Sequence, residues 1–369
     1  MKKILIINSK PIFEDKGNLY IYKETGKFLI ELNRYEDIKV LLFQLKMPAE
    51  NNDFLADFDI SDEKFCFFLT KRRKFKILSY FLAVFKGLRA IYEADFYYQF
   101  YPTNKFYEAF AILSFLFGKK IGLYVRGEQN ITTPISKYLY KKAKVILTIS
   151  PKFTKMINNF GGNAYTIKPM MELDYEDIVY NRSYDNKTIY QLLFVGRIEK
   201  AKGVFEIVEA VKILNRKGFF NFKVNMIGDG EDLDELMTLV SEYKIADYIE
   251  FHGSITDFSK LSSFYKNNDL FIFPSHNEGF PRVIYEAMIL GLPIITSFVG
   301  SISSLLTDGY DCVEVKTHNA EDIASKISPF LEHYASKALI AKNATITIFN
   351  YLKDKRESHA KQLYKLITK

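Results

Sequence analysis

The stretch of sequence that decides the fold is residues 269–288, which read DLFIFPSHNEGFPRVIYEAM. It begins with a short apolar run typical of a buried strand, continues through a polar loop and ends in a segment with helical spacing. Pro281 suits the first position of that helix, and Gly279 lets the backbone approach a ligand closely. Unpaired N–H groups at such a helix start favour an anion beyond the strand's carboxyl end, where open α/β sheets bind ligands. The stretch therefore predicts a ligand site.

Two carboxylates belong to this stretch, Glu278 in the loop and Glu286 one to two turns into the helix. Their spacing places them at different depths of one pocket rather than on one helix face. Carboxylates accept hydrogen bonds from vicinal hydroxyls, such as those of ribose or a hexose. Alone, either residue would more often be a surface carboxylate, but the surrounding strand, loop and helix favour a ligand role. We interpret His276 and His252 as loop or strand-end residues with local hydrogen bonds rather than as catalysts.

A second strand, turn and helix start precede this stretch at residues 194–203, which read FVGRIEKAKG. They place Arg197 and Lys202 at the mouth of the same sheet. Two cations suit a diphosphate, because arginine binds it in a bidentate fashion and lysine acts as a point charge. A further loop at residues 227–231 lacks the third glycine of the dinucleotide fingerprint, so a dehydrogenase is not indicated.

The chain has 369 residues, of which 48% are hydrophobic and 26% are charged, and its formal net charge is +7. This composition excludes disordered, collagen-like and disulfide-framework proteins, and the length favours two domains with a core each. No apolar run reaches the roughly 18 residues that a membrane span needs. The two cysteines, Cys66 and Cys312, are far apart in the sequence, which favours a reducing, cytoplasmic compartment.

The basic residues concentrate in the first half, where residues 1–150 carry 25 Lys and Arg against 16 Asp and Glu. Residues 71–89 contain seven of these basic residues, no acidic residue and several aromatic ones. Such a segment either binds an anionic membrane surface, at roughly 1 kcal/mol per basic residue, or is an ordinary helix with solvated charges. We give the two interpretations equal weight. No recognition motif accompanies the charge, so we expect no nucleic-acid partner.

Short β-rich runs alternate with helical stretches from end to end, which predicts parallel βαβ units. In the first half we expect strands at residues 3–8, 39–43, 65–69, 96–101, 120–125, 145–149 and 165–167. In the second half we expect them at residues 188–195, 222–227, 248–251, 270–273, 293–296 and 312–315. Helices are expected at about residues 203–217, 231–243, 257–266, 281–290 and 320–333, with one or two more in the tail.

A polar, acidic break after the first series of units predicts a domain boundary. We expect an N-terminal α/β domain at residues 1–168 and a linker at 169–187. A C-terminal α/β domain follows at residues 188–345, and a last helix lies within residues 346–369.

Taken together, these motifs resemble the retaining glycosyltransferases of family 4. Glu278 and Glu286 match that family's two-glutamate signature, with seven residues between them. The basic pair matches through residues 196–197 and 202–203, and residues 291–295 match the strand that follows the signature helix. The resemblance implies the GT-B fold, an α/β architecture of two facing Rossmann-like domains with parallel sheets and an interdomain cleft. It further implies that the N-terminal domain lies on the acceptor side, that the C-terminal domain binds the donor, and that the last helix, within residues 346–369, packs back on the N-terminal domain.

The resemblance also implies roles for individual residues. Arg197 and Lys202 would hold the donor pyrophosphate and stabilise the departing nucleoside diphosphate, while Glu278 would hold hydroxyls of the donor sugar. Glu286 would accept the ribose hydroxyls, and residues 252–255 would contact the nucleobase through their backbone. We therefore expect catalytic roles for Arg197, Lys202 and Glu278. Donor-binding roles are expected for Glu286, Gly279, Phe280, Gly196, Gly253, Ser254, Gly17 and Arg126.

Three features depart from the family pattern. The loop expected after the first strand, residues 9–18, supplies Gly17 where the family commonly has a glycine pair. The first half has no histidine to place near the donor sugar, and Arg126 occupies a comparable position after the strand at residues 120–125. Ser304 stands where an acidic residue is common.

The resemblance implies a retaining enzyme of the hexosyltransferase type that needs no metal ion and no cofactor. Its donor would be a sugar linked to a nucleoside diphosphate, UDP or GDP, and its acceptor a saccharide or lipid-linked saccharide in surface polysaccharide or glycan biosynthesis. We expect it in the cytoplasm, with peripheral attachment to the inner face of the cell membrane if residues 71–89 bind lipid. The alternatives are a GT-B sugar-nucleotide epimerase and a non-catalytic protein that binds sugar nucleotides.

Overall fold

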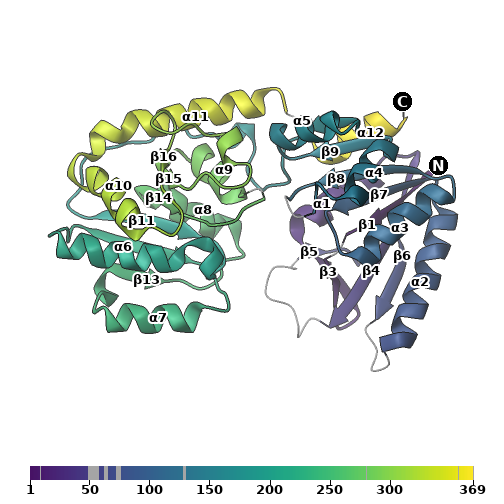
Figure 1. Ribbon diagram of the computed structural model, residues 1–369, viewed down its shortest axis with the longest axis horizontal. Helices are drawn as coiled ribbons and strands as arrows, with labels where there is room; N and C mark the ends of the chain where they lie inside the picture. Colours follow the sequence, from purple (N-terminus) through teal and green to yellow (C-terminus); the bar gives the residue numbers. More distant parts are fainter. Residues whose placement is uncertain are drawn as a thin grey trace. The chain divides into compact units, whose positions relative to one another are not determined.

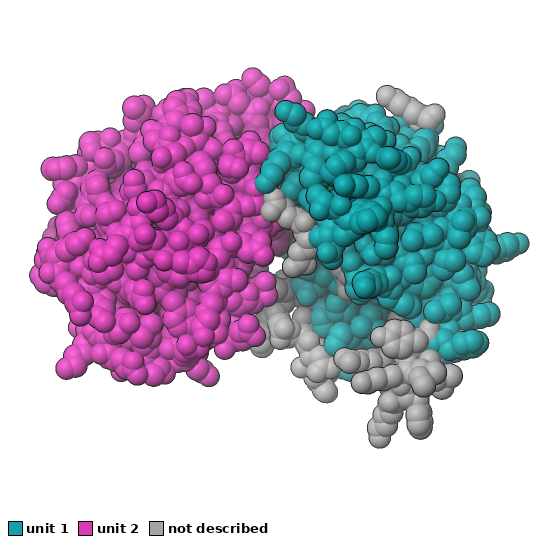
Figure 2. Space-filling model, in the orientation of Figure 1, with its two compact units in different colours: residues 1–170, 357–369 teal, residues 171–356 magenta. Residues whose placement is uncertain are grey.

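The computed structural model describes residues 1–8, 10–48, 58–61, 65–71, 76–127, 130–279, 281–355 and 357–368. The chain forms two compact units, coloured separately in Figure 2. Unit 1 comprises residues 1–170 and 357–369, and unit 2 comprises residues 171–356. Each unit contains a sheet of largely parallel strands with helices packed on it (Figure 1), so the predicted α/β class is confirmed.

The sheet of unit 1 has a parallel centre in the order β10-β9-β8-β7-β1-β4, and β6 also pairs with β4. Its middle strand β7 is buried along its whole length, as expected of a strand covered on both faces. The bounds are β1 Lys2–Ile7, β4 Ile38–Pro48, β6 Cys66–Lys71, β7 Phe96–Tyr101, β8 Lys120–Val125, β9 Val145–Thr148 and β10 Ala164–Thr166. The helices are α1 Lys23–Asn33, α2 Lys76–Glu93, α3 Lys105–Leu116, α4 Pro134–Lys142 and α5 Pro151–Asn159.

Residues 12–21, after β1, form a hairpin, so the expectation of a loop over residues 9–18 is wrong. Strand β2 (Ile12–Asp15) pairs with β3 (Asn18–Ile21) in antiparallel register, and β2 continues the sheet beside β4. The two turn residues, Lys16 and Gly17, have φ angles of 46° and 92°. Positive φ at both central residues defines the tight turn whose twist matches paired strands. A lysine at the first of these positions is an uncommon signal, and this explains why the pattern gave no hairpin. Strand β5 (Phe58–Asp59) pairs with β3.

The sheet of unit 2 is parallel, in the order β13-β12-β11-β14-β15-β16. Helix α6 contacts α7 and α10, whereas α9 contacts α11 (Figure 1). Strand order reverses between β11 and β14, and open α/β sheets bind ligands outside the carboxyl ends of strands at such a point. The strands are β11 Tyr190–Val195, β12 Phe222–Ile227, β13 Ile249–Phe251, β14 Leu270–Phe273, β15 Ile294–Thr296 and β16 Val313–Glu314. The helices are α6 Val204–Arg216, α7 Leu233–Glu242, α8 Phe258–Asn267, α9 Arg282–Ile289, α10 Ala320–Glu332 and α11 Ala338–Lys353.

The stretch expected as a linker, residues 169–187, lies from residue 171 onward in unit 2 and is tied to it. The guanidinium of Arg182 donates to the backbone carbonyls of Tyr265 and Leu290, each at 3.0 Å, and to that of Asn268. An arginine fork that binds three carbonyls fixes the path of the chain across the ends of α8 and α9.

The chain ends in unit 1 with helix α12 (His359–Thr368), which contacts α1. The ring of Tyr364 stacks on that of Tyr35 with centroids 3.9 Å apart, and the ammonium of Lys2 donates to the Ile367 carbonyl at 2.7 Å. Unit 1 is therefore completed by residues from both ends of the sequence. Among the helices of the described residues, none has the length and hydropathy needed to cross a membrane.

Candidate functional site

The loops at the carboxyl ends of β11, β12 and β14 meet through glycines that pack backbone against backbone. Gly203 has a φ of 71°, and a Cβ there would lie 2.2 Å from the carbonyl oxygen of Pro274. A Cβ on Gly228 would lie 1.8 Å from the carbonyl oxygen of Gly196. No side chain fits at such distances, so these glycines set how closely the loops approach one another. The predicted donor residue Gly196 is thus part of this backbone contact.

Lys202 and Glu278, predicted from separate motifs, form an ion pair at this edge of the sheet. The Lys202 ammonium lies 2.5 Å from Glu278 Oε1, and the two side chains are only 15% and 10% exposed. The hydroxyl of Ser275, which is fully buried, lies 3.1 Å from the same carboxylate oxygen. The sequence pattern did not single out Ser275, because a serine after a strand has many ordinary uses.

The segment after β15, residues 297–301, packs against the loop that carries Glu278 and hydrogen-bonds to its backbone. Gly300 has a φ of 63°, and a Cβ on it would lie 1.8 Å from the Glu278 carbonyl oxygen. The Ser301 hydroxyl donates to the Gly279 carbonyl at 2.8 Å, and the Ser297 hydroxyl donates to the backbone of the same loop. The position of Glu278 is therefore set by residues about twenty positions further along the chain.

Glu286 lies in α9 and is 8% exposed. The Tyr265 hydroxyl, on α8, donates to Glu286 Oε2 at 2.8 Å. Burial, and secondly the Glu286 carboxylate, raise the pKa of Tyr265, so its hydroxyl stays protonated and remains a donor. This bond fixes the orientation of the carboxylate. Pro281, expected as the first residue of α9, is instead its N-cap, one position earlier.

Arg197 does not join the largely buried Lys202–Glu278 pair. Its side chain is 68% exposed and forms an ion pair with Glu199. An exposed ion pair holds a long side chain only weakly, so Arg197 can turn toward an anionic ligand at little cost.

The remaining predicted residues of unit 2 lie in the loops at the same edge of the sheet. Gly253 has a φ of 65°, and its carbonyl accepts a hydrogen bond from the Gly228 amide at 2.9 Å. The next residue, Ser254, is exposed. Phe280 lies outside the described residues.

Two predicted donor residues belong to unit 1. Gly17 lies at the tip of the β2–β3 hairpin, where the turn itself explains its positive φ. Arg126 follows β8, and its guanidinium donates to Asn8 Oδ1 at 3.3 Å and lies 5.2 Å from the centroid of the Phe100 ring. The arginine is therefore anchored at the carboxyl ends of β1 and β8.

Unit 1 contains a histidine after all, because α12 brings His359 into its core. The His359 ring lies among aromatic rings, and Nε2 is 2.7 Å from the Tyr98 hydroxyl. Burial, with Arg126 contributing, lowers the pKa of His359 to about 3, so the ring is neutral. The family resemblance predicted that the last helix packs on the N-terminal domain, but no local pattern showed that its histidine enters the core.

Comparison with solved structures gives the fold. The structure of Alr3699/HepE from Anabaena in complex with UDP superposes with a TM-score of 0.70 at 17% identity, covering 100% of both chains. Sucrose-phosphate synthase from Thermosynechococcus elongatus superposes with a TM-score of 0.69 at 16% identity, covering 100% of this chain and 98% of the other. The two units therefore have the GT-B fold, as predicted.

Comparison of sequences finds a match that lies within unit 2. Residues 181–347 match the family model of group 1 glycosyl transferases. Staphylococcus aureus CapM, a capsular polysaccharide biosynthesis glycosyltransferase, is 32% identical over 160 residues, or 42% of this chain and 40% of CapM. An N,N'-diacetylbacillosaminyl-diphospho-undecaprenol alpha-1,3-N-acetylgalactosaminyltransferase of Campylobacter jejuni is 30% identical over 171 residues, 46% of this chain and 43% of the relative. The matches thus span less than half the length of either relative.

Proposed function

We propose that this chain is a retaining glycosyltransferase of family 4, of the hexosyltransferase type, which uses a nucleoside-diphosphate sugar as donor. The observation that carries the proposal is the largely buried Lys202–Glu278 pair at the strand-order reversal of unit 2. A cation and a carboxylate side by side suit the junction of a pyrophosphate and a sugar. The match of residues 181–347 to group 1 glycosyl transferases supports the same assignment.

Each charged residue has a task in this proposal. Donor binding would exchange the Lys202–Glu278 contact for two new ones, with the ammonium on the pyrophosphate and the carboxylate on a sugar hydroxyl. Arg197 would turn from Glu199 to the phosphates, and Glu286 would accept the ribose hydroxyls. Two cations near the leaving group stabilise the negative charge that develops there, usually the largest catalytic term. The proposal therefore requires no metal ion at the pyrophosphate and no cofactor.

The proposed reaction breaks the bond between the anomeric carbon and the diphosphate oxygen. The acceptor hydroxyl oxygen forms the new bond on the same face of the sugar, and its proton passes to the departing phosphate oxygen. This step needs no second carboxylate to serve as base, unlike glycoside hydrolysis by paired carboxylates. The acceptor would be a saccharide or lipid-linked saccharide in glycan or surface polysaccharide biosynthesis, and the base of the donor UDP or GDP.

Unit 1 carries a surface that suits an acceptor embedded in a membrane. On α2 the side chains of Phe81, Phe85 and Tyr92 are 70%, 62% and 77% exposed, and their spacing places them on one face. Exposed aromatic side chains on one helix face, with basic residues nearby, are typical of helices that lie in an anionic membrane surface. An ordinary helix would carry polar side chains on this face, because α2 already covers β4 and β6 with its opposite face, where Ala83 and Ala90 are buried. The rest of the basic stretch, residues 72–75, lies outside the described residues.

The membrane part of the proposal is tested with vesicles. The protein should sediment with vesicles that contain phosphatidylglycerol and less with phosphatidylcholine vesicles. The double variant Phe81→Ser/Phe85→Ser should lose most of this binding, whereas Phe220→Ser, which changes an exposed phenylalanine of unit 2, should keep it. Equal binding by both variants would contradict a role for α2.

The enzymatic proposal is tested by incubating the protein with UDP- and GDP-sugars, with and without a panel of saccharide and lipid-linked acceptors. A product whose new linkage has the anomeric configuration of the donor supports retention. A new sugar nucleotide formed without acceptor would favour the epimerase instead. Nucleotide binding with no turnover across the panel would favour the non-catalytic protein.

A further inference from the structure

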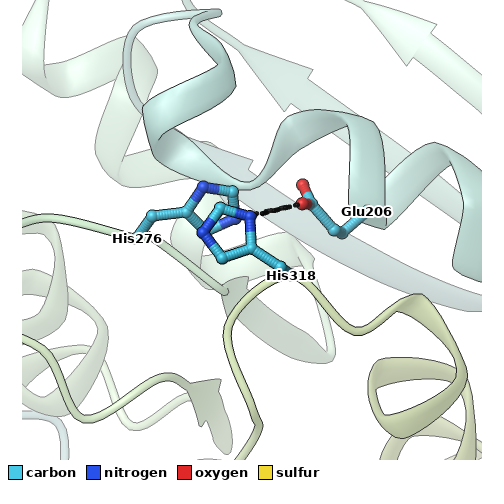
Figure 3. A group of neighbouring side chains, drawn as sticks. All are labelled: Glu206, His276 and His318. Carbon is cyan, nitrogen blue, oxygen red and sulfur yellow. Dashed lines mark ion pairs between the residues drawn. The ribbon is translucent and has the colours of Figure 1, made fainter.

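Three side chains of metal-binding types meet in unit 2 on elements distant in sequence. Glu206 lies in the first turn of α6, His276 in the loop after β14 and His318 in the loop before α10. Figure 3 shows the two imidazole rings beside each other, with the Glu206 carboxylate directed toward them. Neither the two-glutamate motif nor the basic pair includes any of these residues.

The distances within this cluster fit a single metal ion. Glu206 Oε1 lies 3.1 Å from His276 Nε2 and 3.5 Å from His318 Nδ1, and the three ligand atoms lie within 4.8 Å of one another. Ligand atoms about 2.0–2.1 Å from a tetrahedral zinc ion are about 3.4 Å apart. The distances from Glu206 Oε1 to His276 Nε2 and to His318 Nδ1 are therefore already close to those between the ligand atoms of a zinc site.

The burial of the cluster supports the same conclusion. The side chains of Glu206 and His276 are 15% and 14% exposed, so neither is an ordinary solvated surface group. His276 Nε2 is buried, and it faces the Glu206 carboxylate 3.1 Å away. A metal ion between the two groups would bind the nitrogen and the carboxylate oxygen together. His318 is 69% exposed, so its ring can adjust at little cost.

We propose that Glu206, His276 and His318 bind a divalent first-row transition metal ion, with Zn²⁺ as the best fit. Two imidazoles and one carboxylate are a known zinc ligand set, which leaves a fourth position for water. Mg²⁺ and Ca²⁺ prefer sets made of oxygen ligands, so the two nitrogens select against them.

The ion would fasten the loop that carries Glu278. His276 lies two residues before Glu278, and its amide donates to the Ala201 carbonyl at 2.9 Å, next to Lys202. A metal bond from His276 to α6 would join the same two segments a second time. The site is thus a brace beside the Lys202–Glu278 pair, and no step of the proposed transfer passes through the ion.

The test is titration of the untagged, chelator-treated chain with Zn²⁺ in a calorimeter. One zinc ion should bind per wild-type chain, and Glu206→Gln and His318→Asn should each weaken binding at least tenfold. Asparagine is chosen because His318 has a φ of 55°, a conformation that asparagine tolerates. The matched control His333→Asn removes an exposed histidine elsewhere and should bind like the wild type.

A second measurement, independent of calorimetry, uses the visible absorption of bound Co²⁺. Co²⁺ in a four-coordinate site gives intense visible absorption bands, which the wild type and His333→Asn should acquire and His318→Asn should lack. Equal zinc affinity in all four proteins, the same weakening in His333→Asn or effective competition by Mg²⁺ would each overturn the proposal.

Discussion

Replacing Lys202 with methionine removes one charge from a nearly buried ion pair and keeps most of the apolar stem. The Glu278 carboxylate, 10% exposed, then retains the Ser275 hydroxyl at 3.1 Å but loses the ammonium at 2.5 Å. Removing one partner of a buried pair costs about 3–5 kcal/mol, because a charge stays buried without compensation. Both groups keep some contact with water, so we expect the lower end, about 3 kcal/mol.

This loss is large enough to measure by thermal unfolding. Residues 171–356 form a unit of a size for which 1 kcal/mol shifts the Tm by about 2–4 °C, so Lys202→Met should lower it by about 6–12 °C. The control is Lys200→Met, since Lys200 pairs with Glu235 at 2.8 Å but both side chains are about 60% exposed. Exposed pairs add little to stability, so this variant should unfold near the wild-type temperature.

The double variant Lys202→Met/Glu278→Gln separates the charge effect from lost packing. Removing both charges leaves no uncompensated group, so much of the lost Tm should return. If Lys202→Met unfolded at the same temperature as Lys200→Met, the pair would not be buried as described. If the double variant lost as much Tm as the two single variants together, the stability would not come from the ion pair.

Three further predictions follow from other residues. Glu278→Gln should bind UDP at least as tightly as the wild type, because Lys202 is released for the phosphates, yet it should lose most turnover. Calorimetry measures the UDP affinity and product assays measure the turnover. A loss of UDP affinity would contradict the assigned roles. Gly300→Ala should lower the free energy of unfolding more than Gly309→Ala does. Both glycines have positive φ, but only a Cβ at position 300 meets the Glu278 carbonyl. Chemical denaturation measures both losses, and equal losses would exclude the clash. His359→Gln should reduce the loss of stability that unit 1 shows as the pH falls. The folded pKa of about 3 lies below the unfolded value of about 6.5, so the contribution of His359 to wild-type stability is full above pH 6.5 and is lost at about 1.4 kcal/mol per pH unit between pH 6.5 and pH 3. Parallel curves of unfolding free energy against pH for the two proteins, measured in urea, would refute this.

The sequence predicted the elements whose burial is continuous. Strands β7 and β14 are short apolar or aromatic runs, each preceded by an aspartate and followed by a proline, and both begin and end where expected. Period and length are local properties, so the alternation of strands and helices could be read without the structure. The hairpin of β2 and β3 was missed because its turn begins with Lys16, which most often adopts other conformations.

The sequence predicted which residues form the site but not which of them contact one another. Both motifs placed charged residues at one edge of a sheet, yet nothing in the sequence showed that Lys202, rather than Arg197, pairs with Glu278 across 76 positions. The support from Gly300 and the convergence of Glu206 with two histidines depend on how loops pack. Such contacts are set by tertiary structure, and single-sequence patterns carry no signal for them.

The central claim, a nucleoside-diphosphate site built around Lys202 in unit 2, is tested most directly by thermal unfolding with UDP, GDP and ADP. A ligand that binds only the folded state adds about 2.7 kcal/mol at a hundred times its Kd. We predict that UDP or GDP raises the Tm of the wild type in a concentration-dependent manner and has little effect on Lys202→Met. No shift with any of the three nucleotides at millimolar concentration, or an equal shift in Lys202→Met, would contradict the account.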